Sequence, residues 1–575
     1  MSRSVTDPRE GEFDKFLDLW SRRDFVRNMG AAAAFTAFAL GGLEFLEACG
    51  NSTTTGGPSG ATPKKGGHVV ELSIADIKTL NPVLTSDTAS SAIVSQIYDG
   101  LYSTDSKAQL FPLLAKDQPK VSSDQLTYTI KLRDGMKWSD GTPITSDDVL
   151  FTYQLMWDPK YKDVNSPRRA DLEQYVESIT APDATTIVFK TKTIYAPFAI
   201  SQLSYGVLPR KEWGNLAPKE VNSTALNSAP TVTNGAFKNV VWKKGESITV
   251  SANDTYYRGR PYLDTWITKI VASSTAILDQ LKTGEGDIGS VDASQFDATK
   301  TVDSLNLFSV PQLSFLFYLY QMDSSKSKLF QDKSVRQALV LALDRPSIAK
   351  AIYFNQATVA NTSMPPASWA YNKDNKPVFP FDKAKAESML DAAGWKKGSD
   401  GTRANSAGDK LKFEMITNAG NKVRENMLVN MQQSWKDIGV DATPKFVDFN
   451  KVLVPAITDT RQFQVLLVGF SWGIDPDQAA VFHSRNSAPG GFNGMSYKNP
   501  ALDKVLDDAT GTTDMKKRKD LYFQMQQIIA DDMPAPVLFF PNNIQAINKR
   551  VNGVVVDTFT GRRAYQKDVW VADQK

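Results

Sequence analysis

The chain has 575 residues, of which 41% are hydrophobic and 22% charged, and its formal net charge is +3. This balance, without long basic blocks, excludes a nucleic-acid-binding tract, and the length predicts two or three domains. With one cysteine and two histidines, neither a disulfide framework nor a histidine or thiolate metal site is expected, and no cofactor is predicted.

Residues 1–48 are typical of an export signal. Arg22 and Arg23 precede an apolar run of small residues and resemble the address read by the bacterial twin-arginine exporter. The run ends at Leu-Glu-Ala-Cys, which resembles a lipobox whose cysteine, Cys49, receives acyl chains before cleavage. Because Glu44 interrupts the run well short of the roughly 20 apolar residues that cross a bilayer, lipid is the expected anchor. We therefore expect an extracytoplasmic protein, in the periplasm or on the outer face of the cell membrane.

Residues 49–66 are rich in glycine, serine, threonine and proline. Such a composition cannot bury apolar surface and behaves as a flexible coil. The segment is predicted to be a lipidated tether, and the globular part is expected to begin near His68.

From there, short β-branched or aromatic runs alternate with longer helical patterns, which predicts a mixed α/β (α+β) fold. Helices are predicted after the N-cap residues Asp382, Asn499 and Asp514, and the first should end at Gly394. Strands are predicted at 127–132, 247–250, 315–320, 413–416, 464–468 and 536–540.

A series of short motifs runs in order from about residue 66 to the C-terminus. The motifs are LNP at 80–82, IYDGL at 97–101, LRDGMKWSDGTPITSDDV at 132–149, NGAF at 234–237, YYRGRPYLD at 256–264, VRQAL at 335–339, ALDR at 342–345, AAGW at 392–395, DP at 475–476 and YKNPALD at 497–503. Together they resemble family 5 of the bacterial extracellular solute-binding proteins, the peptide- and nickel-type receptors of ABC importers. Arg336 and Arg345 of these motifs are expected to orient helices, not to contact ligand.

The resemblance implies a fold of the periplasmic-binding-protein type, with two lobes, a hinge and an extra inserted domain. Solute would bind in the cleft between the lobes, and the closed form would dock on a membrane permease. The protein is expected to act as a monomer, with no nucleic acid partner. Mapped onto this chain, the domains are lobe I at 67–103, 239–312 and 545–575, the insert at 104–238 and lobe II at 313–544.

The residues after the strand at 464–468 are the first candidates for ligand contact. In the peptide-binding members, an aspartate shortly before the Asp-Pro pair holds the ammonium group of the peptide. Here residues 469–474 contain no acid, so Asp475 is the candidate replacement. Trp472 lies in the same loop and is expected to contact the ligand.

Further candidates for the binding site are Trp369, Asn418 and Asn493. Trp395 and Trp435 are predicted to pack in the core, because they lie at the end of one helical pattern and within another. An indole at the ammonium position would also suit an apolar or sugar face. The ligand is therefore expected to be a peptide or an oligosaccharide.

Two alternatives of other classes remain. A lipid-anchored binding or sensor protein that is not coupled to import would carry the same features. Gly-Phe-Ser-Trp-Gly at 469–473 matches the hydrolase elbow G-x-S-x-G, but His483 follows too closely to complete its triad, so no catalytic residue is predicted. Residues 284–289 match G-x-G-x-x-G but follow a helical pattern, the reverse of the dinucleotide fingerprint.

Overall fold

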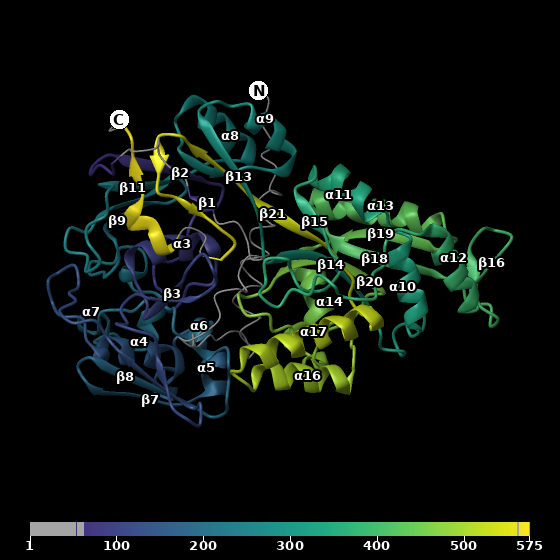
Figure 1. The fold of residues 1–575 in the computed structure, drawn as a ribbon, viewed down its shortest axis with the longest axis horizontal. Helices are drawn as coiled ribbons and strands as arrows, with labels where there is room; N and C mark the ends of the chain where they lie inside the picture. The colour runs from purple at the N-terminus through teal and green to yellow at the C-terminus, as the bar shows by residue number, and fades with distance from the viewer. Residues whose placement is uncertain (1–52, 55–61, 560–562, 574–575) are drawn as a thin grey trace. The chain divides into compact units, whose positions relative to one another are not determined.

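The structure is a computed structural model that describes residues 53–54, 62–559 and 563–573. The export signal, including Arg22 and Arg23, and the predicted lipidation site Cys49 lie outside the described residues. The chain forms two compact units (Figure 1). Unit 1 holds residues 311–509 and 514–542, and unit 2 holds the described residues up to 310 together with 510–513 and those from 543 onward.

Both units combine helices with mixed sheets, which confirms the predicted fold class. The chain passes between the units at 310/311 and 542/543, and for a short stretch at 509/510 and 513/514. The lobe boundaries at 312/313 and 544/545 stay a prediction. Residues 104–238, the predicted insert, lie within unit 2.

The sheet of unit 1 is built around β14, whose seven residues are all buried. β18 runs parallel to both β19 and β20, whereas β14 is antiparallel to β20 and β21. Uniformly apolar strands of this kind are typical of a sheet covered on both faces. The strands, in sheet order, are β19 (Asp441–Val447), β18 (Lys412–Asn418), β20 (Val465–Ser471), β14 (Ser314–Tyr320) and β21 (Val537–Asn548).

The helices of unit 1 begin at the predicted caps. Asp382 accepts a hydrogen bond from the backbone N–H of Lys385 at 2.9 Å, and Asp514 accepts one from Lys517 at 3.0 Å. Gly394 adopts a φ of +84° just after the first of these helices, as a C-terminal glycine does. The helices are α10 (Lys333–Leu341), α11 (Arg345–Tyr353), α12 (Lys383–Ala392), α13 (Lys422–Lys436), α14 (Val454–Thr458), α15 (Ala479–Phe482), α16 (Pro500–Thr510) and α17 (Met515–Asp532).

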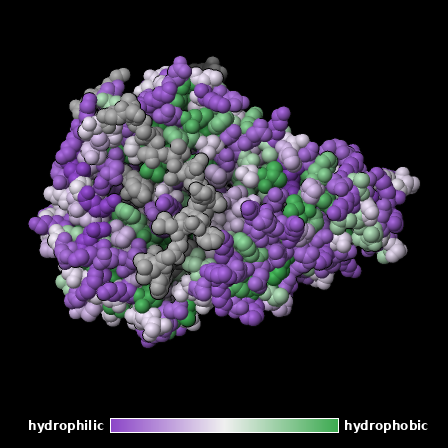
Figure 2. All heavy atoms as spheres, viewed as in Figure 1, coloured by the Kyte–Doolittle hydropathy of each residue, from purple (hydrophilic) through white to green (hydrophobic). Residues whose placement is uncertain are grey.

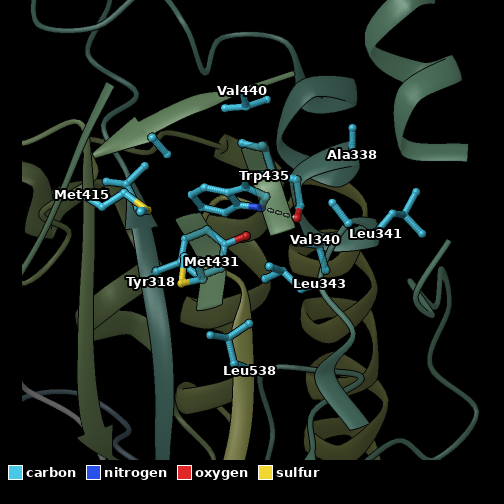
Figure 3. Packing of buried hydrophobic residues seen from close by; sticks show 14 of the residues in the cluster. Tyr318, Ala338, Val340, Leu341, Leu343, Met415, Met431, Trp435, Val440 and Leu538 are labelled. Carbon is cyan, nitrogen blue, oxygen red and sulfur yellow. Dashed lines mark hydrogen bonds between the residues drawn. The ribbon is translucent and has the colours of Figure 1, made fainter. Parts of the chain in front are cut away.

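The core of unit 1 surrounds Trp435 on α13 (Figure 3). Its indole packs edge-on against Tyr318 at 5.8 Å between ring centroids, and its N–H donates to the carbonyl of Leu339 at 2.8 Å. Trp395 belongs to the same buried cluster. The prediction that these two tryptophans pack in the core is therefore confirmed.

The main sheet of unit 2 has β2 at its centre, parallel to β11 and β12. The G-x-G-x-x-G segment forms the turn from α8 into β12, so the predicted order of helix before strand is confirmed. A Cβ on Gly286 would lie 2.4 Å from the Leu72 side chain, so close packing explains this glycine. The elements are β12 (Ile288–Ser290), β2 (His68–Ser73), β11 (Thr265–Ile270), β10 (Ser247–Ala252), β9 (Phe237–Lys243), α3 (Thr88–Ile97), α8 (Ser274–Thr283) and α9 (Phe296–Lys300).

A second, antiparallel sheet of unit 2 lies within the predicted insert. Its strands, in order, are β5 (Lys120–Val121), β6 (Thr127–Lys131), β8 (Thr186–Thr191) and β7 (Val176–Asp183), with helices α4 (Ser146–Trp157), α5 (Arg169–Tyr175), α6 (Phe198–Gln202) and α7 (Arg210–Trp213). β13 (Leu305–Pro311) and β15 (Ala357–Val359) both pair with β21. The remaining strands, each of two or three residues, are β1 (Thr53–Thr54), β3 (Tyr102–Thr104), β4 (Leu110–Pro112), β16 (Lys396–Lys397), β17 (Arg403–Ala404), β22 (Val551–Asn552), β23 (Val555–Val556) and β24 (Trp570–Val571).

The face drawn in Figure 2 is mostly hydrophilic, and the hydrophobic residues on it are scattered. Within the described ranges, no helix is both long enough and apolar enough to cross a membrane. The large hydrophobic residues that are exposed are Val241, Phe354, Val378, Phe381, Val429, Phe446 and Val452.

Candidate ligand-binding site

A polar stripe runs along α17 and is formed by Arg518, Tyr522 and Gln526, which repeat every four residues and are buried. Nη2 of Arg518 donates to both carboxylate oxygens of Asp475, at 2.8 and 2.6 Å, and both side chains are 0% exposed. The Tyr522 hydroxyl donates to the same carboxylate at 3.0 Å. Burial is the largest single effect and lowers the pKa of Arg518, but the Asp475 carboxylate and the Tyr522 hydroxyl together outweigh it, and the net shift is upward. The charge of Asp475 is therefore already neutralised inside unit 1.

The same stripe holds the loop of residues 361–372. The side-chain carbonyl of Gln526 accepts hydrogen bonds from the Thr362 hydroxyl at 2.9 Å and from the backbone N–H of Asn372 at 3.1 Å. Its amide group donates to the carbonyl of Ala370 at 2.7 Å. Trp369 in this loop packs its ring edge-on against Tyr522 at 5.7 Å.

Trp472 follows β20 directly and is 4% exposed. Its ring stacks on Phe315 with 4.5 Å between centroids and 19° between planes, so one face is covered. Its indole N–H and the amide of Gln478 both donate to the carbonyl of Ser363, each at 3.0 Å. The loop after β20 is therefore joined to the loop of residues 361–372.

These contacts bring together three of the five residues that the sequence singled out, Trp369, Trp472 and Asp475. The other two lie in different surroundings. Asn418 ends β18 and accepts a hydrogen bond from Nη1 of Arg424 at 2.6 Å. Asn493 is fully buried and closes its own loop, donating to the carbonyl of Tyr497 at 2.7 Å and accepting from its N–H at 3.0 Å. Contact between any of the five and a ligand stays a prediction.

Sequence reasoning missed Asp477, the acid just after the Asp-Pro pair. Its carboxylate is 2% exposed, and one oxygen accepts from the backbone N–H of Ala479 at 2.8 Å. The other oxygen has no hydrogen-bond partner among the described residues. Burial, opposed by that one backbone hydrogen bond, raises the pKa of Asp477 to about 7. In the family pattern the acid lies before the Asp-Pro pair, whereas Asp477 directly follows it.

Two more buried polar atoms near the shared Ser363 carbonyl lack a partner in the part of the chain that the structure describes. They are the hydroxyl of Ser363 and the side-chain carbonyl of Gln478. With Asp477, the two joined loops thus carry three buried atoms that can accept a hydrogen bond. Most buried polar atoms in proteins are paired, so these three are candidates for hydrogen bonds to a ligand.

A cavity of about 30 Å³ borders the start of the 361–372 loop, and its lining includes Ser363, Arg345 and Met533. It has room for about one water molecule and is too small for a peptide. Arg345 donates to the carbonyls of Phe379, at 2.7 Å, and Ala360. Nη1 of Arg336 likewise donates to the carbonyl of Phe330 at 2.7 Å, so both arginines orient backbone as predicted.

The hydrolase pattern is explained by the fold. Ser471 is the last residue of β20 and pairs with Ser314 of β14. His483 accepts from the backbone N–H of Arg485 at 3.1 Å, and its other ring nitrogen lies 3.3 Å from Asp507. Among the described residues, no group of three or more His, Cys, Asp or Glu side chains could hold a metal ion.

The model of the bacterial extracellular solute-binding proteins, family 5, matches residues 109–493. The oligopeptide-binding protein AppA of Bacillus subtilis is 33% identical over 514 residues, which cover 88% of this chain and 93% of AppA. The glutathione-binding protein GsiB of Escherichia coli is 26% identical, over 85% of this chain and 91% of GsiB.

Solved structures agree. AppA from Bacillus subtilis, in complex with a nonapeptide, has a TM-score of 0.72 at 32% identity and covers 89% of this chain and 100% of its own. NikZ from Campylobacter jejuni, in complex with Ni(L-His), also has a TM-score of 0.72, at 26% identity, and covers 88% of this chain and 99% of its own. The chain belongs to family 5 of the bacterial extracellular solute-binding proteins. It is a solute-binding receptor and not an enzyme, as expected from the sequence.

Proposed function

We propose that the protein is the peptide-binding receptor of an ABC importer. Relatives that are similar over most of the chain are named for oligopeptide binding or for ABC transporter peptide binding. One solved relative holds a nonapeptide. A receptor of this kind needs only a ligand that favours its closed state.

The observation that carries the peptide ligand is the group of three unpartnered atoms at Ser363, Asp477 and Gln478. Carboxylate and amide oxygens accept hydrogen bonds only, so the group suits a ligand rich in N–H donors. Peptides supply such donors along the backbone and, at the amino end, an ammonium group. We propose that Asp477 serves as the counter-charge for which the sequence suggested Asp475, because Asp475 is already paired with Arg518.

The aromatic residues support this ligand over an oligosaccharide. Sugars stack on an open aromatic face, whereas Phe315 covers one face of Trp472 and little of the ring is exposed. We propose that Trp472 and Trp369 border the peptide, and that Asp475, Asn418 and Asn493 hold the surrounding loops through the hydrogen bonds described above.

We also propose an oligomeric state, an export route and a membrane anchor for the protein. The mature protein would be a monomer, exported through the twin-arginine signal Arg22-Arg23 and anchored in the membrane by lipid on Cys49. Closure around the peptide would present the receptor to a permease. Replacing Cys49 by serine should release the protein from the membrane fraction, and replacing both arginines by lysine should leave it in the cytoplasm.

Native mass spectrometry of the mature domain, together with calorimetric titration of di- to pentapeptides and oligosaccharides, tests the ligand. We expect that a peptide co-purifies with the protein or binds to it in titration. Small-angle scattering should then show a smaller radius of gyration when the peptide is bound. An oligosaccharide ligand, or no response to any peptide, would overturn the proposal. Loss of peptide uptake on deletion of the permease separates an import receptor from a sensor that is not coupled to import.

A further inference from the structure

The short strand β1 lies in the predicted tether, between the proposed lipidation site and the globular part, and it is paired. Thr53 and Thr54 run antiparallel to β23, with Thr53 opposite Val556 and Thr54 opposite Val555 (Figure 1). Among the residues that the structure describes, no other strand pairs with β23. The composition of the tether predicted a flexible coil, because it cannot bury apolar surface. Pairing through the backbone needs no apolar side chain, so the composition does not exclude it.

The body of unit 2 holds β23 in place. The strand before it, β22, pairs with β24, with Val551 opposite Val571. Between β22 and β23, Gly553 has a φ of +77°, and a Cβ there would lie 2.3 Å from the carbonyl oxygen of Asp568. Val556 of β23 is 2% exposed. An edge strand that is fixed in this way offers backbone groups to a partner strand, so only the tether loses conformational freedom when the two pair.

The globular part begins beside the same C-terminal strands, so the tether does not have to cross unit 2 to reach β23. The N–H of Gly66 donates to the carbonyl of Tyr262 at 2.8 Å, and the N–H of Tyr262 donates to the carbonyl of Lys567 at 3.1 Å. The Arg550 side chain donates to the carbonyl of His68 at 3.1 Å. Arg550 directly precedes β22, and Lys567 lies shortly before β24. The end of the tether is therefore attached to the segment that also carries β23.

The paired residues lie close in sequence to the proposed lipid. Thr53 is the fourth residue after Cys49, and an extended chain spans about 3.6 Å per residue, so roughly 14 Å is the largest distance between them. Without the pairing, the tether would be attached to unit 2 only at about Gly66, the seventeenth residue after Cys49. A coil of that length has an end-to-end distance of roughly 20–25 Å and extends to about 60 Å. The pairing thus removes most of the freedom that the tether would give an anchored protein.

We infer that β23 is a docking edge for the tether, and that the pairing turns the C-terminal segment of unit 2, residues 549–559 and 563–573, toward the membrane. The inference rests on the lipid anchor proposed above and adds an orientation to it. The occupant of the edge is β1 of the same chain, and the surface beside it faces the lipid bilayer. A receptor held in this way keeps one side of unit 2 toward the membrane in which the proposed permease lies.

Disulfide trapping tests the pairing without the lipid. Cys49 is the only cysteine of the chain, so Cys49→Ser leaves the mature protein without a thiol. Opposite residues of antiparallel strands have Cα atoms about 4.5–5.5 Å apart, which suits a disulfide. We expect Thr54→Cys with Val555→Cys to form the bond about 10-fold faster under mild oxidation than Ser59→Cys with Val555→Cys. Both proteins carry the same change in β23, and equal rates would overturn the docking.

Fluorescence quenching tests the orientation in the lipidated protein. Vesicles of phosphatidylcholine and phosphatidylglycerol carry a short-range quencher on the lipid headgroups, and a dye is attached to Ala572→Cys, an exposed position directly after β24. Thr53→Pro with Thr54→Pro removes both N–H groups of β1. Quenching should then fall about two-fold or more, because the reach of the tether rises from roughly 14 Å to roughly 20–25 Å. Ser59→Pro, in the same tether, is the matched control and should leave quenching unchanged.

Two results would overturn the orientation: unchanged quenching in the double proline variant, or an equal fall in Ser59→Pro. If the wild type does not bind the vesicles, the proposed lipid anchor fails and the orientation fails with it. Disulfide trapping still decides in that case whether β23 binds the tether. Peptide binding is measured separately, so none of these outcomes is confused with a failure of the proposed receptor function.

Discussion

The stripe on α17 and the loop that follows β20 both bury charge in unit 1, but they satisfy it to different degrees. Arg518 of the stripe binds both oxygens of Asp475, and every polar group of Gln526 is paired as well. Asp477, two residues along the loop, is equally buried, yet one oxygen lacks a partner and its pKa is raised to about 7. Paired charge holds the two loops in position, whereas the unpaired group costs stability.

The largest effect on stability is expected from breaking the paired charges, Arg518 and Asp475. Arg518→Met leaves the Asp475 carboxylate buried without its partner, and should lower the free energy of unfolding by about 3–5 kcal/mol. Urea unfolding followed by circular dichroism measures the loss. A loss below about 1 kcal/mol would show that Asp475 finds water or another partner.

A double variant sharpens this result. Arg518→Met combined with Asp475→Leu removes both charges, and replacing a buried pair by apolar residues is often neutral. We therefore expect the double variant to recover most of the stability that Arg518→Met loses. If it does not, the hydrogen bonds to Tyr522 and Ala509 carry more of the stability than the pair.

Replacing the unpaired acid, Asp477, should raise stability instead of lowering it. The pKa of Asp477 is higher in the folded state than in the unfolded chain, so the folded state binds the proton more tightly. The free-energy cost of burying the charged Asp477 carboxylate is absent below the unfolded pKa near 4 and grows as the pH rises to about 7. Asp477→Asn should therefore be more stable than wild type by about 1–4 kcal/mol at pH 8.

The same pair of proteins should have similar stability at pH 4, which serves as the internal control. Urea unfolding from pH 4 to pH 8 measures both curves. Parallel curves would mean that the Asp477 carboxylate is solvated or paired. In titrations with a peptide, Asp477→Asn should bind more weakly, so stability and affinity move in opposite directions.

Gln526→Leu probes the part of the stripe that carries no charge. It removes the partners of the Thr362 hydroxyl, the Asn372 N–H and the Ala370 carbonyl, and should cost about 1–3 kcal/mol of stability. Gln527→Leu, on an exposed position of the same helix, is the matched control. Equal losses in both variants would contradict a specific role for Gln526.

The smallest effect is expected where the two loops meet. Trp472→Phe removes one of two hydrogen bonds to the Ser363 carbonyl, and Gln478 still supplies the other, so the loss should be about 0.5–1.5 kcal/mol. Trp435→Phe, which removes the partner of the Leu339 carbonyl within the buried cluster of unit 1, should cost more. Thermal unfolding of both variants tests the order.

Local signals in the sequence predicted much of the fold. The apolar run at 315–320 is β14, and the caps Asp382 and Asp514 begin α12 and α17. β21 was predicted only at 536–540, but it continues to Asn548. Its second half contains Asn542, Asn543 and Gln545, and these polar side chains interrupt the apolar run from which the strand was predicted.

The site was harder to predict, because its contacts join distant parts of the chain. The sequence indicates Trp369, Trp472 and Asp475 as separate candidates. No local pattern shows that side chains of α17 contact both Trp369 and Asp475. Asp475 and its partner Arg518 are 43 residues apart in sequence. The missing partner of Asp477 is a property of the folded packing, so no pattern of residue types could have shown it.

The carbonyl of Ser363 accepts from both Trp472 and Gln478, and this has a consequence for local unfolding. A carbonyl has two lone pairs, so both are used and neither loop can separate without breaking a bond to the other. The loops should therefore open as one cooperative segment, with amide protons of residues 361–372 and 472–478 exchanging with solvent together. Two stretches about 100 residues apart would behave as a single foldon, and a ligand that binds one would slow exchange in both.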